Sequence, residues 1–180
     1  MVPWVSQFRR GMEKESGPPL LMLATIDAAG RPRCRTIVIR GVRDDGRVVA
    51  CTDARSEKVE QIDANDRVEA CVWFADSRTQ FRLAGTARLI GPEDDDSARV
   101  WRELSDSARA LFAWPTPMLP REDEEAFVKG VPSNDPVPET FRVLEVTPTS
   151  CDHLALGVLP HERTIWTQLP DGWTDQPVNP

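Results

Sequence analysis

The chain has 180 residues, a length that suits one domain with a sizeable buried core. Its net charge of −7 and pI near 4.9 argue against general nucleic-acid binding, because contacts to phosphates require a basic surface. We find no apolar run of membrane-spanning length and no signal peptide. We therefore expect a single cytoplasmic domain over residues 1–180 that has no membrane or nucleic-acid partner.

After a short amphipathic stretch that ends near Met12, the first strongly patterned segment is Arg33–Arg40. Its centre is rich in β-branched residues, which favours a strand with side chains pointing alternately to opposite faces. Arg35 then shares a face with Ile37. A turn over residues 44–46 follows, and residues 47–52 are expected to return as the second strand of a hairpin.

Polar donors gather where this second strand ends and a helix is expected to begin. Ser56 is placed as the N-cap, and a helix N-terminus presents unpaired N–H groups with a partial positive charge. Thr52, Arg55 and Lys58 add a hydroxyl and two cations, a set of donors that would suit a phosphate monoester. An ordinary surface helix, with Lys58 paired to a neighbouring glutamate in solvent, would explain the same residues and is the commoner arrangement.

The segment over residues 78–89 alternates cleanly between two kinds of side chain. Gln80 and Arg82 fall on one face with other polar residues, while Phe81 and Leu83 fall on the other. Such alternation is typical of a half-buried strand whose apolar face packs on a core. The polar row could equally be the solvated face of an antiparallel sheet.

The remaining segments predict further helices, loops and strands. Acidic clusters precede the helices expected over Ser97–Phe112 and Phe127–Lys129, and compensation of the helix dipole explains them without a metal. Proline-rich stretches around these helices predict a loop-rich excursion. Strands are expected over Phe141–Val146 and His161–Leu169.

The four cysteines, Cys34, Cys51, Cys71 and Cys151, are scattered without a Cys-x-x-Cys pair, and the two histidines are distant from them. We therefore predict no metal site and small, buried, reduced thiols.

Together these segments resemble the pyridoxamine 5′-phosphate oxidase-like family of FMN-binding split barrels. The first family motif, an Arg followed by an apolar strand that ends in a basic residue, is matched by Arg35–Arg40. The second is matched by Cys51-Thr52 and 56–58, and the third by 79–82 with Gln80. Pro160–Arg163 is similar to the family's C-terminal His-Asp-Arg element. The match extends from about Leu20 to Pro180 and is poor between Pro92 and Glu139.

The resemblance implies a mainly β fold with flanking helices, built on a six-stranded antiparallel split β-barrel. It also implies noncovalently bound FMN at the interface of a homodimer. The residues that inherit contacts to the flavin phosphate are Arg35, Thr52, Ser56 and Lys58. Those that inherit contacts to the rest of the flavin are Thr36, Ile37, Val38, Arg40, Cys51, Gln80 and, from the partner subunit, Arg163.

Three departures from the family pattern concern the substrate or the flavin. Where the vitamer oxidase holds its substrate phosphate with Tyr, Arg and Ser, this chain has Trp101, Ser105 and Arg109 at comparable spacing. A substrate-contacting Arg is replaced by Leu159, and a flavin-contacting Trp by His153. Because a phosphate dianion needs paired cations to leave water, we expect a substrate other than pyridoxamine phosphate, although Arg109 could restore some of the contact.

The expected function is that of an FMN-dependent oxidoreductase acting on a small unidentified molecule, with oxygen or a nicotinamide closing the cycle. No residue stands out as a general acid or base, so the catalytic residues are left unassigned. A storage or sensing flavoprotein, a vitamer oxidase with altered contacts, and a binding module without flavin remain alternatives. Trp73 and Trp101 are interpreted as structural, and Trp114 either fills the core or stacks on an aromatic ligand.

Overall fold

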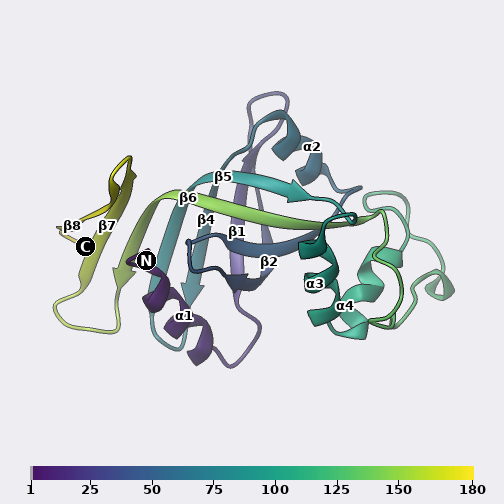
Figure 1. Cartoon of the computed structure of the whole chain (residues 1–180), viewed down its shortest axis with the longest axis horizontal. Helices are drawn as coiled ribbons and strands as arrows, with labels where there is room; N and C mark the ends of the chain where they lie inside the picture. The colour runs from purple at the N-terminus through teal and green to yellow at the C-terminus, as the bar shows by residue number, and fades with distance from the viewer. Residues whose placement is uncertain (1) are drawn as a thin grey trace.

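The computed structural model, which describes residues 2–180, shows six antiparallel strands closed into a barrel with flanking helices (Figure 1). Pairing of β3 with β6 closes the strand order β3-β2-β1-β4-β5-β6, which confirms the predicted split barrel. The barrel strands are β1 (Leu20–Ile26), β2 (Pro32–Val42), β3 (Val48–Asp53), β4 (Arg67–Phe74), β5 (Thr79–Ile90) and β6 (Phe141–Ala155). The strands β7 (Glu162–Leu169) and β8 (Gly172–Val178) extend the sheet beyond β6. The helices are α1 (Val5–Lys14), α2 (Glu57–Ala64), α3 (Asp95–Glu103) and α4 (Asp106–Ala110).

The long strand β6 splits the barrel. Its first part, Phe141–Val146, pairs with β3, and its last part, Ser150–Ala155, pairs with β7, while β5 follows it along nearly its whole length. The sequence predicted only the first part as a strand, and Pro148, a residue that disfavours a continuous strand, lies between the two parts. The strand passes this proline where the β5–β6 register shifts, opposite Gly85, at which a Cβ atom would lie 2.1 Å from the Thr147 carbonyl oxygen.

Aromatic side chains fill one end of the barrel beneath α1. Phe8 of this helix packs edge-to-face on Phe74 and Phe81, with ring centroids 5.2 Å from each. Trp4, at the helix start, is fully buried against Phe8. Gly11 allows the close approach, since a Cβ atom there would lie 2.3 Å from the Phe74 ring. The N-terminal amphipathic stretch therefore closes the barrel end opposite the one that α2 covers (Figure 1).

The single helix expected over Ser97–Phe112 is wrong, because the chain breaks between α3 and α4. Ser105 begins a new helix, since its hydroxyl accepts a hydrogen bond from the Ala108 amide at 3.3 Å. The guanidinium of Arg109 donates to the carbonyl oxygens of Trp101 and Leu104 and so satisfies the end of α3.

The helix expected over Phe127–Lys129 is also wrong. A short 3₁₀ turn over Glu124–Ala126 precedes it, and Phe127 instead packs edge-to-face on Trp114 at 5.4 Å. The indole of Trp114 donates to the Val128 carbonyl oxygen, so this tryptophan holds the loop together.

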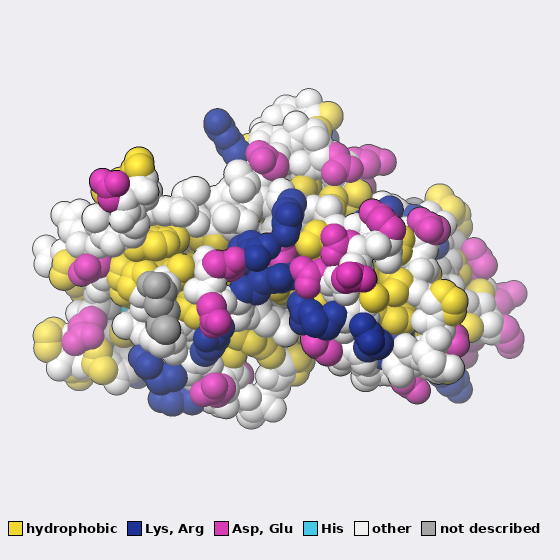
Figure 2. All heavy atoms as spheres, viewed as in Figure 1, with side chains coloured by type: hydrophobic (Ala, Val, Ile, Leu, Met, Phe, Trp, Pro, Cys, Tyr) yellow, Lys and Arg dark blue, Asp and Glu magenta, His cyan; other side chains and the backbone are white. Residues whose placement is uncertain are grey.

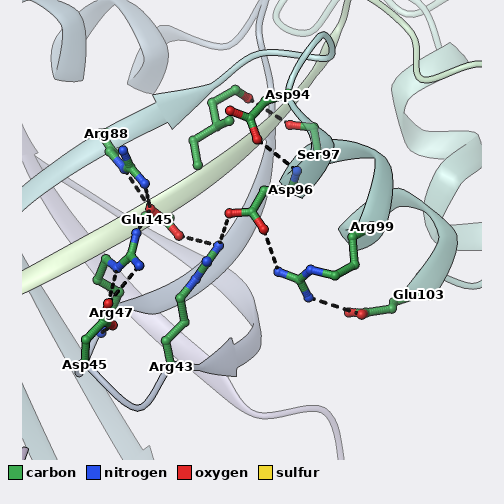
Figure 3. A network of polar contacts seen from close by, with 11 residues as sticks. Arg43, Asp45, Arg47, Arg88, Asp94, Asp96, Ser97, Arg99, Glu103 and Glu145 are labelled. Carbon is green, nitrogen blue, oxygen red and sulfur yellow. Dashed lines mark hydrogen bonds and ion pairs between the residues drawn. The ribbon is translucent and has the colours of Figure 1, made fainter.

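A buried carboxylate joins the strands that carry the hairpin and the barrel seam. Glu145 of β6 is fully buried and contacts Arg43, Arg47 and Arg88 (Figure 3). Arg43 also pairs with Asp96 of α3 at 2.7 Å, so the network links the barrel to that helix. On the surface, Figure 2 shows cationic and acidic side chains next to one another in the middle of this face. In residues 2–180 no helix is long and apolar enough to span a membrane.

Candidate functional site

The polar donors predicted at the start of α2 lie in contact with one another. The Lys58 ammonium lies 3.1 Å from the Thr52 hydroxyl and 2.9 Å from the Ser56 hydroxyl. Ser56 occupies the N-cap position, but its side chain makes no cap hydrogen bond and donates to the Asp53 carbonyl oxygen at 2.7 Å. The Ser56 hydroxyl thus accepts a hydrogen bond from Lys58 and donates one to Asp53, and it does not cap the first amides of α2.

Arg35 of β2 forms the second part of the cluster. Its guanidinium donates to the Thr25 hydroxyl at 2.6 Å and to the Gln61 side-chain oxygen at 2.8 Å. Thr25 and Gln61 are buried and hydrogen-bonded to each other at 2.6 Å. Arg35 pairs in register with Leu23, so it lies on the core-facing side of β2 at the barrel end that α2 covers.

Arg35 is close enough to Lys58 for its charge to disfavour the protonated form of the Lys58 side chain. Burial lowers the pKa of Lys58, and the charge of Arg35 lowers it further. Burial also lowers the pKa of Arg35. Asp53 opposes this effect at Lys58 but is bound by both ends of the Arg55 guanidinium. Two partly desolvated cations beside two hydroxyls form a site that an anion would stabilise.

Arg55 does not join this cluster, contrary to the sequence-based prediction. Its guanidinium is held on the Asp53 carboxylate at 2.6 Å, so the cation is committed to an ion pair within the turn. The alternative in which Lys58 pairs with a glutamate is also wrong: Glu57 lies 3.5 Å from Arg33, and no ion pair of Lys58 occurs within residues 2–180. The cations of the expected anion site are therefore Arg35 and Lys58.

A second group of predicted residues lies on the outer face of the sheet. Register places Trp73, Gln80, Leu154 and Arg163 side by side on four neighbouring strands. Thr36 belongs to the adjacent row, which runs through β1 and β4 to Arg82 of β5. Gln80, Thr36 and Arg163 therefore face the same side.

The cluster around Lys58 and the outer face are not in contact within one chain. Gln80 makes no hydrogen bond with Arg35 or Lys58, and Arg35 faces the core while Thr36 and Val38 face outward. Residues 35 and 38 are about 10 Å apart along β2, which is the scale of a five-carbon polyol phosphate. A ligand that contacts both groups must pass over the edge of β2.

Arg163 is held by an acidic neighbour. Its guanidinium makes two hydrogen bonds with the Asp152 carboxylate, at 2.9 and 2.7 Å. These bonds lower the pKa of Asp152, and the charges of Arg163 and Arg82 contribute further. The pair orients Arg163 on the outer face, in the row that contains Gln80.

The other predicted flavin contacts are divided between core and surface. Ile37 packs against the barrel core, so only its backbone could contact a ligand outside the barrel. Cys51 packs against the second core cluster beneath α3, and burial raises the pKa of its thiol to about 12, which keeps it neutral. Arg40 is exposed and lies beside this thiol.

The residues considered for the substrate have other roles. Arg109 is buried and bonds to Asp106 and to main-chain oxygens, so it cannot restore a phosphate contact. His153 faces inward and stacks on Phe81, with ring centroids 4.4 Å apart. Trp101 is buried as expected, whereas Trp73 is 40% exposed on the outer face and is not a core residue.

Two hollows lie near the predicted residues. A cleft of about 360 Å³ between the β1–β2 turn and α2 is lined by Arg33, Glu57 and Gln61 among others, but by none of the four predicted phosphate contacts. A groove of about 230 Å³ lies between β2 and α3 and includes Val38 and Arg40. Within residues 2–180 no cluster of His, Cys, Asp and Glu could hold a metal ion.

Comparison with known proteins identifies the family. Residues 1–91 match the family model described as pyridoxamine 5′-phosphate oxidase, FMN-binding domain. The chain is 33% identical over 174 residues to pyridoxine/pyridoxamine 5′-phosphate oxidase 2 of Arabidopsis thaliana, covering 89% of this chain and 86% of that protein. The chain belongs to the pyridoxamine 5′-phosphate oxidase FMN-binding family. A similar oxidase of Chromobacterium violaceum is 27% identical over 91% of this chain and 79% of its own length.

Solved structures of the family share the fold. A pyridoxamine 5′-phosphate oxidase-related, FMN-binding protein of Nostoc punctiforme superposes with a TM-score of 0.90 at 33% identity, covering 100% of this chain and 99% of the other. PhzG of Burkholderia lata, solved with tetrahydrophenazine-1-carboxylic acid, gives a TM-score of 0.80 at 19% identity over 97% and 90% of the two chains. The second likeness supports the fold alone.

Sequence reasoning missed the residues that hold the predicted contacts in place. Thr25 and Gln61 orient Arg35, and Asp152 orients Arg163. The available signal was a polar residue facing inward near a strand end, Thr25, and another on a helix, Gln61. The first could not be used because β1 had not been predicted as a strand. Their partners are set by register and helix docking, which local patterns do not give.

Proposed function

We propose that this chain is an FMN-dependent oxidoreductase that acts on a small unidentified molecule. Membership in an FMN-binding family supports the cofactor. The carrying observation is the cluster in which Lys58 and Arg35, both partly desolvated, lie beside two hydroxyls without a free carboxylate.

In this proposal the cluster holds the flavin phosphate. Lys58 and Arg35 supply charge, and Thr52 and Ser56 supply hydroxyl protons that can turn to a bound anion, from the Ser56 oxygen and from the Asp53 carbonyl oxygen respectively. A dianion between the two cations would remove their mutual repulsion and replace the water that burial has excluded. The donor set therefore fits a phosphate monoester.

The outer face would hold the ring system. Gln80 can donate to and accept from the polar edge of a flavin, and the extended backbone of Thr36–Val38 offers further groups. Bound FMN would supply hydride transfer, and cations near its polar edge favour the anionic reduced ring. The protein's part is to orient the ring and to limit its contact with water.

A homodimer completes the proposed site. The outer face carries the half-exposed apolar side chains of Leu20 and Trp73, at 44% and 40% exposure, next to Gln80. A second copy that covers this face would bury them and bring Arg163 to the partner's flavin. This arrangement would also explain why the two groups of predicted residues do not meet within one chain.

A flavin-binding protein without turnover, for storage or sensing, is the second candidate. The burial of Arg109 favours it, because the helix region then lacks the cation that a phosphorylated substrate would need. The two candidates predict the same bound cofactor and differ in whether it is reduced and reoxidised.

The test begins with the absorbance of the purified protein after addition of FMN and removal of the excess. We expect a protein-bound flavin band, and bleaching by NADH, NADPH or an oxidisable substrate without oxygen, followed by recovery in air. A bound flavin that no reductant in such a panel bleaches would support storage or sensing. Absence of any bound flavin would overturn both candidates.

A further inference from the structure

The groove between β2 and α3 has a mixed electrostatic character. Its walls combine apolar side chains, Val38 and Ile39 of β2 opposite Val100 and Leu104, with polar surface of about equal weight. Two charged side chains line it, Arg40 and Glu103. A second hollow of about 130 Å³ adjoins it and shares Arg40, Val100 and Glu103 with it. The combined space suits a small organic molecule that carries polar groups as well as a short apolar body.

Arg40 is the cation in this groove that is free to bind a ligand. Its guanidinium makes no ion pair within residues 2–180, and the Cys51 thiol beside it is kept neutral by burial. Arg43 and Arg99, which line the smaller hollow, are both paired with Asp96, at 2.7 and 3.1 Å. Figure 3 shows both arginines directed to that carboxylate.

Glu103 gives the opposite charge to the other wall. Its carboxylate is 60% exposed and lies 3.2 Å from Arg99, a guanidinium that it shares with Asp96. No ion pair joins Glu103 to Arg40 although both line the same groove. The two charged groups therefore line one groove without contacting each other.

This charge pattern does not suit a phosphate monoester. A dianion at Arg40 would find one free cation and would face the carboxylate of Glu103, so its desolvation would not be compensated. A carboxylate ion needs one guanidinium, which can bind it through two parallel hydrogen bonds. An ammonium group on the same ligand would complement Glu103.

We propose that this groove binds a small zwitterion, with its carboxylate on Arg40 and its protonated amine on Glu103. The inference rests on the proposed function, because it names the substrate class of the same site, where Val38 of the expected flavin strand forms part of the wall. It commits the chain to an amino acid-like substrate without a phosphate.

The test on the FMN-loaded protein compares three probes of similar size, 4-(aminomethyl)benzoate, 4-methylbenzoate and 4-methylbenzylamine, with the larger, phosphorylated pyridoxamine 5′-phosphate. Binding is measured by calorimetry and by the change in the flavin spectrum. The 3-(aminomethyl)benzoate isomer is included to cover a shorter span. We expect one of the zwitterions to bind about tenfold or more tightly than each of the other three compounds.

The decisive variant is Glu103→Gln, with Glu125→Gln on the exposed 3₁₀ turn as the matched control. We expect Glu103→Gln to weaken the zwitterion and to strengthen 4-methylbenzoate, so that the preference between them is lost. A merely structural role of Glu103 would weaken all probes together. Arg40→Gln should weaken the binding of the zwitterion and of 4-methylbenzoate, provided that the variant still binds FMN.

Several results would overturn the proposal: tighter binding of pyridoxamine 5′-phosphate, equal binding of the zwitterion and 4-methylbenzoate, or no binding of any probe. Calorimetry without FMN separates this failure from failure of the proposed function. Zwitterion binding by a chain that does not take up FMN would support the groove and contradict the flavin assignment. Flavin binding without a preference for the zwitterion would support the flavin assignment and contradict the groove proposal.

Discussion

Lys58 carries a positive charge that is largely withdrawn from solvent and placed near a second cation. Its hydrogen-bond partners are two hydroxyls, which do not neutralise the charge. Such a group costs stability in the free protein, since a charge leaves water favourably only when it is paired. The arrangement is expected where a ligand supplies the missing negative charge.

The substitution Lys58→Met separates the two effects. We expect it to raise the Tm of the flavin-free protein and to weaken FMN binding by roughly 1.5–3 kcal/mol, the range for a charge-assisted hydrogen bond. Thermal unfolding and a fluorescence titration with FMN measure the two quantities. Lys129→Met, at an exposed loop position, is the control. An unchanged FMN dissociation constant would count against the phosphate assignment.

His153 provides a pH-dependent test of the barrel interior. Burial between Phe81 and Trp166 lowers the pKa of its imidazole below the ordinary value of 6.5. As the pH falls through 6.5, the unfolded chain gains a proton that the folded chain does not yet take up, so the free energy of unfolding decreases.

We expect His153→Phe to remove the part of the decrease in the free energy of unfolding at acid pH that His153 causes, because phenylalanine can stack in the same place without titrating. Urea denaturation at about pH 7.5 and about pH 5.5 compares the free energies of unfolding of the two proteins on either side of the histidine range. The difference between the two pH values should be smaller in the variant. An equal difference in both proteins would mean that other groups cause the pH dependence.

At the scale of elements, the network around Glu145 connects the β2–β3 hairpin, β5, β6 and α3. The carboxylate is fully buried, whereas its three arginines are 23–59% exposed and can regain water. The network therefore depends on the charge of Glu145 more than on any one arginine.

Glu145→Gln should destabilise the fold by roughly 2–3 kcal/mol, less than the loss for a fully buried pair because the arginines stay partly hydrated. Urea denaturation gives the free energy directly. Glu139→Gln, at an exposed position just before β6, is the matched control. A loss below about 0.5 kcal/mol, the size of an ordinary surface effect, would contradict a structural role for the network.

At the scale of the whole molecule, the proposed dimer depends on the outer face of the sheet. Trp73 and Leu20 leave apolar surface exposed there, next to the predicted flavin contact Gln80. Another apolar surface surrounds Met118, which is 83% exposed, on the loop beyond α4. The two surfaces allow a matched comparison.

We expect Trp73→Glu to shift the protein from dimer to monomer and to reduce FMN retention, because a buried interface cannot easily accept an unpaired carboxylate. Met118→Glu should leave both properties unchanged. Analytical ultracentrifugation gives the oligomeric state, and absorbance of the purified protein gives the flavin content. A Trp73→Glu dimer that keeps its flavin would place the interface elsewhere.

The amino-acid sequence determined the elements whose patterns are local. The hairpin from Arg33 to Thr52, the polar start of α2 and the alternation along β5 follow from β-branched residues, turn residues and parity. The spacing of the three motifs also indicated the family and its barrel, which the comparisons and the strand order confirm.

Tertiary structure alone decided which side chains meet. Arg55 pairs within its turn, Arg109 closes the end of α3, and Trp73 points outward, although local sequence suggested other roles. Strand register, the bulge opposite Gly85 and the docking of α2 on the barrel end set these contacts. They depend on residues far apart in the chain, so a pattern read along the sequence predicts the strands and not the partners of their side chains.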